Sequence, residues 1–320
     1  MIFCATAAFA QKQPTPVHII LDSDMGPDYD DVGAITILHA LADKGEAEIL
    51  ATIASTKYEG VAGVLNVFNT YFERPGIPIG VPKGNALNLR DFQHWTDTLL
   101  AKYPHQIKTN AEAWDAVKLY RKILANQPDH SVTIVSIGFL TNISNLLNTK
   151  ADEYSPLSGK ELIKRKVKLL VSMAGGYPAG KEFNMMEDAP ASKNVYENCD
   201  VPVIFSGGEI GSKIKTGVPL INNIAIKNDP VKDVFRISIP LAKEDSAGRM
   251  SWDETAVLVA IKGYSPWYQL HKGKIAITAD GGDTWDDTGT GQAYLVEKTN
   301  PTVIQKVINE LIMHQPGGKK

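Results

Sequence analysis

The segment from residue 17 to residue 41 reads VHIILDSDMGPDYDDVGAITILHAL. It begins with a short β-rich run and continues through an acidic turn that contains Gly26 and Pro27. From Val32 onward, apolar residues recur at helical spacing. The segment therefore predicts a strand, a loop and a helix in that order.

Similar units follow along the chain. Further strands are expected at 48–54, 78–81, 132–137, 167–173 and 201–205, and further helices at 61–72 and 110–126. Several of these strands are nearly continuous apolar runs, which is typical of a parallel sheet covered by helices on both faces. The polar stretches 87–110 and 223–253 are interpreted as excursions above the strand ends. The sequence predicts a single-domain α/β fold with a doubly wound, mostly parallel sheet.

The amino-acid composition and the net charge restrict the classes of partner that this protein can bind. The 320 residues carry a formal net charge of -3, and no basic stripe is present, which argues against a nucleic-acid partner. A small substrate that is uncharged or cationic is easier to accommodate. No stretch beyond the N-terminus approaches the ~20 apolar residues that span a bilayer.

The first residues resemble the end of a secretory signal. The apolar segment 2–10 ends in Ala8-Phe9-Ala10 before Gln11, a small-x-small pattern typical of a cleavage site, although the basic region is missing. We interpret residues 1–16 as a signal-peptide remnant and linker and residues 17–320 as the domain. The expected location is periplasmic or secreted. The alternatives are a slightly apolar N-terminus and, less favoured, a lipoprotein site at Cys4.

Five carboxylates lie within ten positions after the first strand: Asp22, Asp24, Asp28, Asp30 and Asp31. Turn and helix-capping roles would explain one or two of them, but not five at one strand end. Their mutual repulsion calls for a cation. Hard oxygen ligands suit Ca²⁺ or Mg²⁺ better than zinc, for which no His/Cys set is present.

Several motifs resemble the inosine-uridine nucleoside hydrolase family. Asp-Ser-Asp-Met-Gly at 22–26 followed by Asp30-Asp31 is similar to its N-terminal signature, and Gly-Phe-Leu-Thr-Asn at 138–142 is similar to its Gly-x-Leu-Thr-Asn segment. Met-Ala-Gly-Gly at 173–176, Glu-Phe-Asn at 182–184 and Asp-Ala-Pro-Ala at 188–191 resemble a further stretch. Trp252-Asp253 stands where the family has His-Asp, and 281–285 resembles a late turn. Their ordered occurrence is more specific than any one motif.

The resemblance implies a Rossmann-like fold, a calcium site and the substrate contacts of a nucleosidase. It implies that calcium is held by Asp24, Asp31, Asp253 and the backbone carbonyl of Thr141. It also implies that Asp24 is the general base for the attacking water. Asp22 would orient this arrangement, and Asn142 is of uncertain role, because it could simply cap the following helix.

The resemblance also implies a set of sugar contacts. Asp30 is expected on the ribose 2′-hydroxyl, Glu182 and Asn184 on the 3′ and 5′ side, and Met173 against the sugar face. Hydrogen bonds that tighten at an oxocarbenium-like transition state would lower the barrier. Taken alone, Glu182 could be a surface charge.

The chain departs from the family pattern at three places. The spacing from Asp24 to Asp30 is two residues longer than usual, so Asp28 also stands at the distance of the ribose contact. An expected Gly-Asn segment is replaced by residues 55–58. Trp252 replaces the family's acid, and an indole cannot donate a proton at neutral pH.

Three explanations of Trp252 remain open. Another residue supplies the proton, the base leaves unprotonated while stacked on rings such as Trp252 or Tyr177, or the true substrate is a different N-riboside. By residue type alone, candidate acids are His39, His94, His105 and His271.

The predicted function is hydrolysis of ribonucleosides to free base and ribose, with a nucleoside as the partner and, from family habit, a homodimer or homotetramer. The competing hypotheses are an exported riboside-binding protein with little turnover and a hydrolase of another N-riboside. A haloacid-dehalogenase-like phosphatase also opens with Asp-x-Asp, but its later metal motif is missing around residues 206–209.

Overall fold

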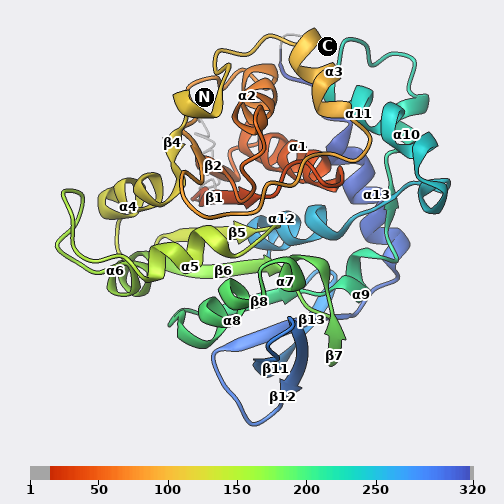
Figure 1. The fold of residues 1–320 in the computed structure, drawn as a ribbon. Helices are drawn as coiled ribbons and strands as arrows, with labels where there is room; N and C mark the ends of the chain where they lie inside the picture. Colours follow the sequence, from red (N-terminus) through yellow and green to blue (C-terminus); the bar gives the residue numbers. More distant parts are fainter. Residues whose placement is uncertain (1–14, 318–320) are drawn as a thin grey trace, which may run out of the picture.

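The computed structural model describes residues 15–317 (Figure 1). All but the last two residues of the predicted signal remnant and linker at 1–16 therefore lie outside the described residues. The first strand, β1, begins at Val17. None of the helices in the described part of the chain has the length and apolar character needed to cross a bilayer.

One sheet of eleven strands organises the molecule, in the order β4-β3-β2-β1-β5-β6-β8-β13-β11-β12-β7. The strands from β4 to β13 in this order pair in parallel. Their bounds are β1 Val17–Ser23, β2 Ala47–Ala54, β3 Ile79–Val81, β4 Trp114–Asp115, β5 Val132–Ser136, β6 Val167–Met173, β8 Val203–Ser206 and β13 Gln292–Glu297. The predicted doubly wound, mostly parallel sheet is confirmed.

Helices cover both faces of this sheet (Figure 1). Alternate residues of β1 explain why, because Ile19 and Leu21 join one apolar core and Ile20 joins the other. The helices of the first core are α1 (Asp30–Asp43), α2 (Val61–Tyr71), α3 (Trp95–Lys102), α11 (Pro230–Ser238), α12 (Trp252–Lys262) and α13 (Pro301–Ile312). Those of the second are α4 (Ala116–Asn126), α5 (Thr141–Leu147), α6 (Gly159–Lys166) and α8 (Ala189–Asn198).

Short elements fill the connections above the strand ends. They are α7 (Phe183–Glu187), α9 (Gly208–Gly211), α10 (Val218–Asn222) and the 3-10 turns η1 (Asn110–Glu112), η2 (Ile239–Leu241) and η3 (Lys243–Asp245). A separate two-stranded sheet pairs β9 (Lys215–Thr216) with β10 (Arg249–Met250). The polar stretches at 87–110 and 223–253 are the excursions that the sequence predicted.

Two local predictions differ from the structure. The single helix expected over 110–126 is the turn η1, the short strand β4 and helix α4, because Asp115 adopts an extended conformation and caps α4 by accepting a hydrogen bond from the Lys118 amide (2.9 Å). The sequence also gave no hint of the antiparallel extension formed by β11 (Tyr268–Ile277), β12 (Gly282–Asp286) and β7 (Ala179–Lys181). Most of the late turn expected at 281–285 is strand β12.

The order of the strands in the sheet indicates at which end of the strands a ligand would bind. From β1, one half of the chain winds through β2 and β3, and the other through β5 and β6, so the switch point lies between β1 and β5. Ligands in open α/β sheets bind beyond the carboxyl ends of the strands at such a point. The acidic loop after β1 lies at this position.

Candidate active site

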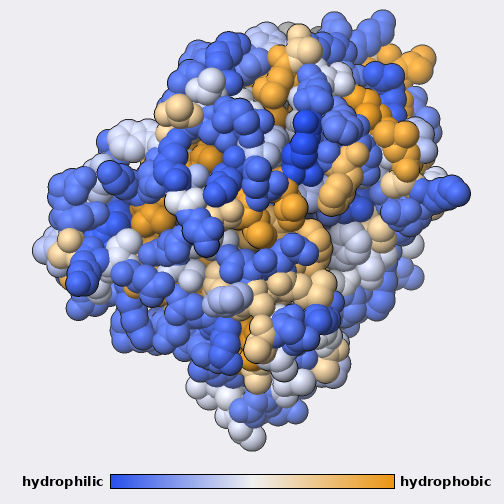
Figure 2. All heavy atoms as spheres, in the orientation of Figure 1, coloured by the Kyte–Doolittle hydropathy of each residue, from blue (hydrophilic) through white to orange (hydrophobic). Residues whose placement is uncertain are grey.

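A cavity of about 420 Å³ opens beside the acidic loop. Its lining brings together residues from seven separate parts of the chain, which are Asp24, Pro27, Asp28, Asp30, Phe92, Gln93, Ile137, Met173, Glu182, Phe183, Asn184, Gly208, Ala242, Glu244, Arg249, Met250, Trp252 and Asp253. Near the centre of the view in Figure 2, over α7 and α12, apolar side chains gather on a largely hydrophilic face. Most of the predicted site residues therefore line one hollow.

Close packing of α12 against α1 carries Asp253 to the acidic loop. A Cβ atom on Gly33 would lie 2.1 Å from the Glu254 carboxylate, so only glycine lets the two helices approach this closely. Asp253 follows the first residue of α12, and Asp30 and Asp31 open α1. Two helix N-termini thus meet at the cluster, and their dipoles favour the negative charge collected there.

One oxygen from each of Asp28, Asp31 and Asp253 lies within 4.8 Å of the other two. Asp31 is fully buried, and its Oδ2 has no hydrogen-bond partner, while its Oδ1 accepts a 2.5 Å bond from the Ser23 hydroxyl. Unpaired buried carboxylates are costly unless a cation neutralises them. These donors fit a hard divalent ion such as calcium or magnesium.

Electrostatics of the cluster supports the same interpretation. Burial, followed by repulsion from Asp30, raises the pKa of Asp31 to about 7. Burial and the charge of Asp31 raise the pKa of Asp24 well above its ordinary value, and burial and the charge of Asp30 do the same for Asp253. A bound cation would reverse this repulsion and favour the ionised carboxylates.

Asp22 lies beneath the cluster and is held from two sides. The Tyr120 hydroxyl donates to Asp22 (2.8 Å), and the Asn142 amide donates to both of its carboxylate oxygens (3.1 and 3.2 Å). Burial raises the pKa of Asp22 to about 7, and these two hydrogen bonds oppose that rise. Asp22 and Asn142 do not line the cavity, and the hydrogen bonds between them hold the carboxyl end of β1 in place.

Met173 and Asn184 lie together at the carboxyl end of β6. The Asn184 side-chain amide donates to the Met173 carbonyl (3.2 Å) and sulfur (3.3 Å). Glu182 caps helix α7 and accepts from the backbone amides of Asn184 (2.7 Å), Gly175 and Met185 (both 3.3 Å). Burial raises the pKa of Glu182 to about 7, and these amide bonds oppose it.

Thr141, whose backbone carbonyl the resemblance implied as a calcium ligand, is not among the residues that line the acidic cavity. Its hydroxyl donates to Asp188, and it lines a different hollow together with Asn145 and Asn194. Ile137, which directly follows β5, lines the acidic cavity instead. Gly138 lets this loop come close to Asp24, since a Cβ atom at this position would lie only 2.7 Å from the Asp24 carboxylate. Of the residues in this loop, Ile137 rather than Thr141 is therefore the one that lines the acidic cavity.

Arg249 is the functional residue that sequence reasoning missed. Its guanidinium donates to Asp30 Oδ1 from two nitrogens (3.0 and 2.7 Å) and pairs with Asp28 (2.5 Å) and Asp245 (3.6 Å). The second oxygen of Asp30 accepts from the Asp253 amide (3.3 Å). Asp30, the predicted ribose contact, is therefore held by Arg249 and α12 while still lining the cavity.

Trp252 is fixed in place at the cavity wall. Its indole N–H donates to the Gly208 carbonyl (2.8 Å), and the Arg249 guanidinium lies 5.0 Å from its ring centroid. Of the histidines that were considered as acids, none is among the residues that line this cavity. No imidazole that could protonate a departing base is therefore part of the described lining.

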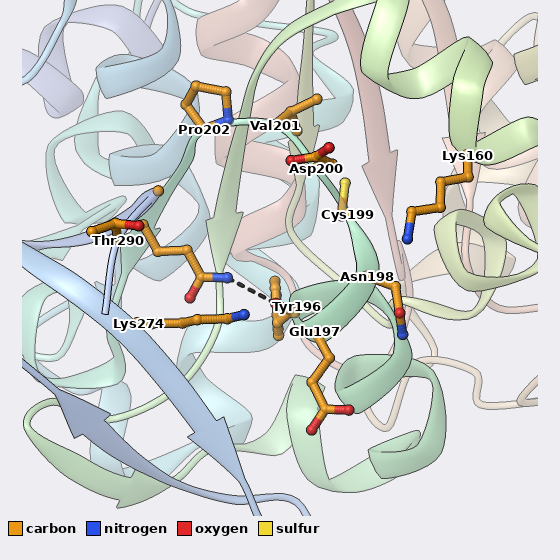
Figure 3. Close-up of a pocket in the computed structure, with 12 residues that line it drawn as sticks. Lys160, Tyr196, Glu197, Asn198, Cys199, Asp200, Val201, Pro202, Lys274 and Thr290 are labelled. Atoms are coloured by element: carbon orange, nitrogen blue, oxygen red, sulfur yellow. Dashed lines mark hydrogen bonds between the residues drawn. The ribbon is translucent and has the colours of Figure 1, made fainter. Parts of the chain in front are cut away.

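A second cavity of about 350 Å³ lies at the amino ends of β8 and β13 (Figure 3). It is bounded by the segments that precede β8 and β13, where the Gln292 amide donates to the Tyr196 carbonyl (2.8 Å). Lys160, Lys274, Glu197 and Asp200 give its wall both signs of charge. Because it lies at the amino ends of these strands, we assign the chemistry to the acidic cavity.

Comparisons with known proteins agree with this geometry. The family model for "Inosine-uridine preferring nucleoside hydrolase" matches residues 19–313. An inosine-uridine preferring nucleoside hydrolase of Leishmania major is 27% identical over 191 residues, which is 57% of either chain. The pyrimidine-specific ribonucleoside hydrolase RihA of Escherichia coli is 28% identical over 229 residues, which is 68% of either chain.

Solved structures share the fold at low sequence identity. A plant nucleoside hydrolase, PpNRh1, superposes with a TM-score of 0.71 at 18% identity, covering 93% of this chain and 99% of that one. An inosine-uridine preferring nucleoside hydrolase from Bacillus anthracis gives 0.70 at 15% identity with the same coverage. The chain belongs to the inosine-uridine preferring nucleoside hydrolase family, and it is a hydrolase that acts on N-glycosyl compounds.

Proposed function

We propose that this protein hydrolyses N-ribosides to ribose and the free base in the acidic cavity, with calcium as its ion. The observation that carries the proposal is the cluster of Asp28, Asp31 and Asp253, whose oxygens lie within 4.8 Å of one another. Asp24, Met173 and Asn184 line the same cavity as Asp28 and Asp253, so a site for a hard cation lies beside a carboxylate base and beside an amide and a thioether that a sugar can contact.

The ion's ligands are proposed from this arrangement. Asp24, Asp31 and Asp253 supply carboxylates, with Asp28 as a further one, and the Ile137 backbone carbonyl takes the role that the resemblance gave to Thr141. The Ile137 carbonyl accepts a long hydrogen bond from the Asn184 amide (3.4 Å), and a carbonyl oxygen has a second lone pair that can bind an ion. Calcium accepts six to eight such oxygens and, when bound, lowers the pKa of water.

The protein's own residues then carry the steps. Asp24 accepts the proton of the water that attacks the anomeric carbon, since it lines the cavity beside the proposed ion. Asp30, oriented by Arg249, and Asn184, oriented by Met173, accept or donate hydrogen bonds to ribose hydroxyls. Carboxylates on this side stabilise positive charge as it develops on the ribose ring.

Ribose release tests the proposal. The calcium-loaded protein is incubated with purine, pyrimidine and pyridine ribosides, and free ribose is measured for the wild type and for Asp24→Asn. Because general-base catalysis contributes roughly 10²- to 10⁴-fold, we expect kcat to fall by that order in the variant. Asp287→Asn, an exposed carboxylate on the far hairpin, is the matched control and should keep full activity.

Two results would contradict the proposal. Saturable ribose binding without release from any riboside would identify a binding protein in place of an enzyme. Unchanged turnover in Asp24→Asn would remove Asp24 as the base while leaving the activity itself in place.

A further inference from the structure

We propose that the preferred leaving group is a cationic nitrogen heterocycle, such as the pyridinium ring of nicotinamide riboside, which departs without being protonated. This inference rests on the proposed riboside hydrolysis and narrows its substrate class. It follows from three features of the cavity: the missing proton donor, the excess of carboxylates and the exposed aromatic rings at the opening.

The missing donor is the first feature. A neutral base must gain a proton as its glycosidic bond breaks, or it leaves as a poor anionic group. The described lining contains no His, Lys, Cys or Tyr side chain. The Trp252 N–H is committed to the Gly208 carbonyl, and Glu182 is committed to three backbone amides as an acceptor. A base that is already cationic needs no such donor.

The excess of carboxylates is the second feature. Six carboxylates line the cavity, at Asp24, Asp28, Asp30, Glu182, Glu244 and Asp253, against the single guanidinium of Arg249. A divalent ion would still leave the lining negative, and such a lining attracts a cation. As the bond breaks, positive charge moves from the heterocycle to the ribose ring, which stays close to Asp24, Asp28 and Asp30. The field therefore favours both the bound substrate and the transition state.

Aromatic rings at the opening are the third feature. Phe92 is 68% exposed and Phe183 is 37% exposed, and both line the cavity. Apolar side chains that are exposed together at the opening of a cavity are typical of a ligand-binding surface. The face of an aromatic ring attracts a planar cation, and Glu244 at the same opening supplies an exposed carboxylate. The rings and the carboxylate together match a cationic heterocycle.

The proposed reaction balances without a further reactant. Water forms the bond to the anomeric carbon and loses one proton to Asp24, and that proton is later released to solvent. The electron pair of the broken carbon–nitrogen bond returns to the ring nitrogen and cancels its positive charge. The products are ribose, a neutral heterocycle and one proton.

The test compares leaving groups on one sugar. The calcium-loaded protein is assayed with nicotinamide riboside, inosine, uridine and 4-nitrophenyl riboside, whose phenolate leaves without protonation. Because a general acid contributes roughly 10²- to 10⁴-fold, we expect kcat/KM for nicotinamide riboside to exceed that for inosine and uridine by at least about 100-fold. Because no group has to donate a proton to the leaving heterocycle, the kcat of the cationic substrate should show no falling limb at high pH.

Each outcome has a distinct meaning. Turnover of inosine or uridine as fast as nicotinamide riboside would overturn the preference but leave riboside hydrolysis intact. Turnover of 4-nitrophenyl riboside without turnover of nicotinamide riboside would do the same. Failure on all four substrates would instead sink the proposed function itself.

Variants separate the contributing groups. Glu244→Gln should raise KM for nicotinamide riboside several-fold while kcat stays the same and 4-nitrophenyl riboside is not impaired. Glu310→Gln, on the distant helix α13, is the control and should change kcat and KM for neither substrate.

His94 follows Gln93 in the loop beside the cavity, so His94→Gln tests whether the His94 imidazole acts as the general acid. A selective loss of inosine turnover in that variant would contradict the proposal.

Discussion

At the scale of single residues, Arg249 explains how so many carboxylates coexist in one place. Its guanidinium is only 9% exposed and contacts Asp28, Asp30 and Asp245, and it also lies over the ring of Tyr29 (5.0 Å). Tyr29 in turn donates to Asp245 (2.5 Å). The acidic loop is therefore partly neutralised by the protein before any ion binds.

Replacing Arg249 by Met should leave these buried carboxylates uncompensated. Breaking a buried ion pair from one side costs about 3 to 5 kcal/mol, so we expect the free energy of unfolding to fall by that amount. Urea unfolding at pH 7.5 in the presence of chelator measures it. Arg236→Met removes an exposed partner of Asp233 and should cost less than about 1 kcal/mol. Equal losses in the two variants would show that Arg249 is not the counter-charge.

Sequence reasoning located the acids of this site but not their partner. Asp24, Asp30, Asp31 and Asp253 were recognisable because carboxylates crowd one strand end and recur in a family pattern. Arg249 stands more than 200 positions from Asp30 in a polar stretch, and no local spacing links the two. Pairings of this kind arise only when the chain folds back.

At the scale of elements, the parallel core was predictable and the edge was not. Strands such as β5 are buried along their whole length, and their sequences are nearly continuous apolar runs. Strand β11 alternates polar and apolar residues and carries His271, Lys272 and Lys274, so its sequence lacks such a run. Its strand character depends on pairing with β12 and β13.

The contact between α1 and α2 contains a histidine that should make stability depend on pH. His39 is fully buried, its Nε2 lies 3.1 Å from the Asn69 oxygen, and its ring stacks on Phe72 at 4.7 Å. Burial, followed by the charge of Arg74, lowers the pKa of His39 from 6.5 to about 3. Between these values the unfolded chain binds a proton that the folded chain does not, so acid destabilises the fold.

We therefore expect His39 to contribute to a loss of stability as the pH falls from 6.5 toward 4. Its share is at most about 1.4 kcal/mol per pH unit. His39→Gln keeps a hydrogen-bonding group beside Asn69 and should flatten this part of the slope in urea unfolding at pH 6.5, 5.5 and 4.5. His94→Gln changes a ring that is 67% exposed and should leave the slope as it is. Identical slopes for wild type and His39→Gln would refute the assignment.

At the scale of the whole molecule, the acidic site couples the two windings of the sheet. Asp31 belongs to the helix after β1, Asp253 to a helix more than 220 residues later, and Ile137 follows β5. An ion bound among them would cross-link these segments in the folded state only. Metal binding should therefore add to the stability of the entire domain.

Chelation should lower the melting temperature, and calcium should restore it more strongly at pH 8 than at pH 5.5. Burial and the neighbouring carboxylate Asp30 raise the pKa of Asp31 to about 7, so the metal-free fold retains protons that the unfolded chain releases near 3.8. Its stability consequently falls as the pH rises through this window. Calcium binds the ionised carboxylates, and at a hundredfold excess over Kd it adds about 2.7 kcal/mol to the free energy of unfolding, which raises the melting temperature by several degrees.

Differential scanning fluorimetry with chelator, calcium or magnesium measures this shift of the melting temperature. Asp31→Asn should abolish the calcium response, whereas Asp287→Asn should retain it. A melting temperature indifferent to chelation at pH 8 would remove the ion from the site, because no other described cluster of carboxylates meets the same geometric condition.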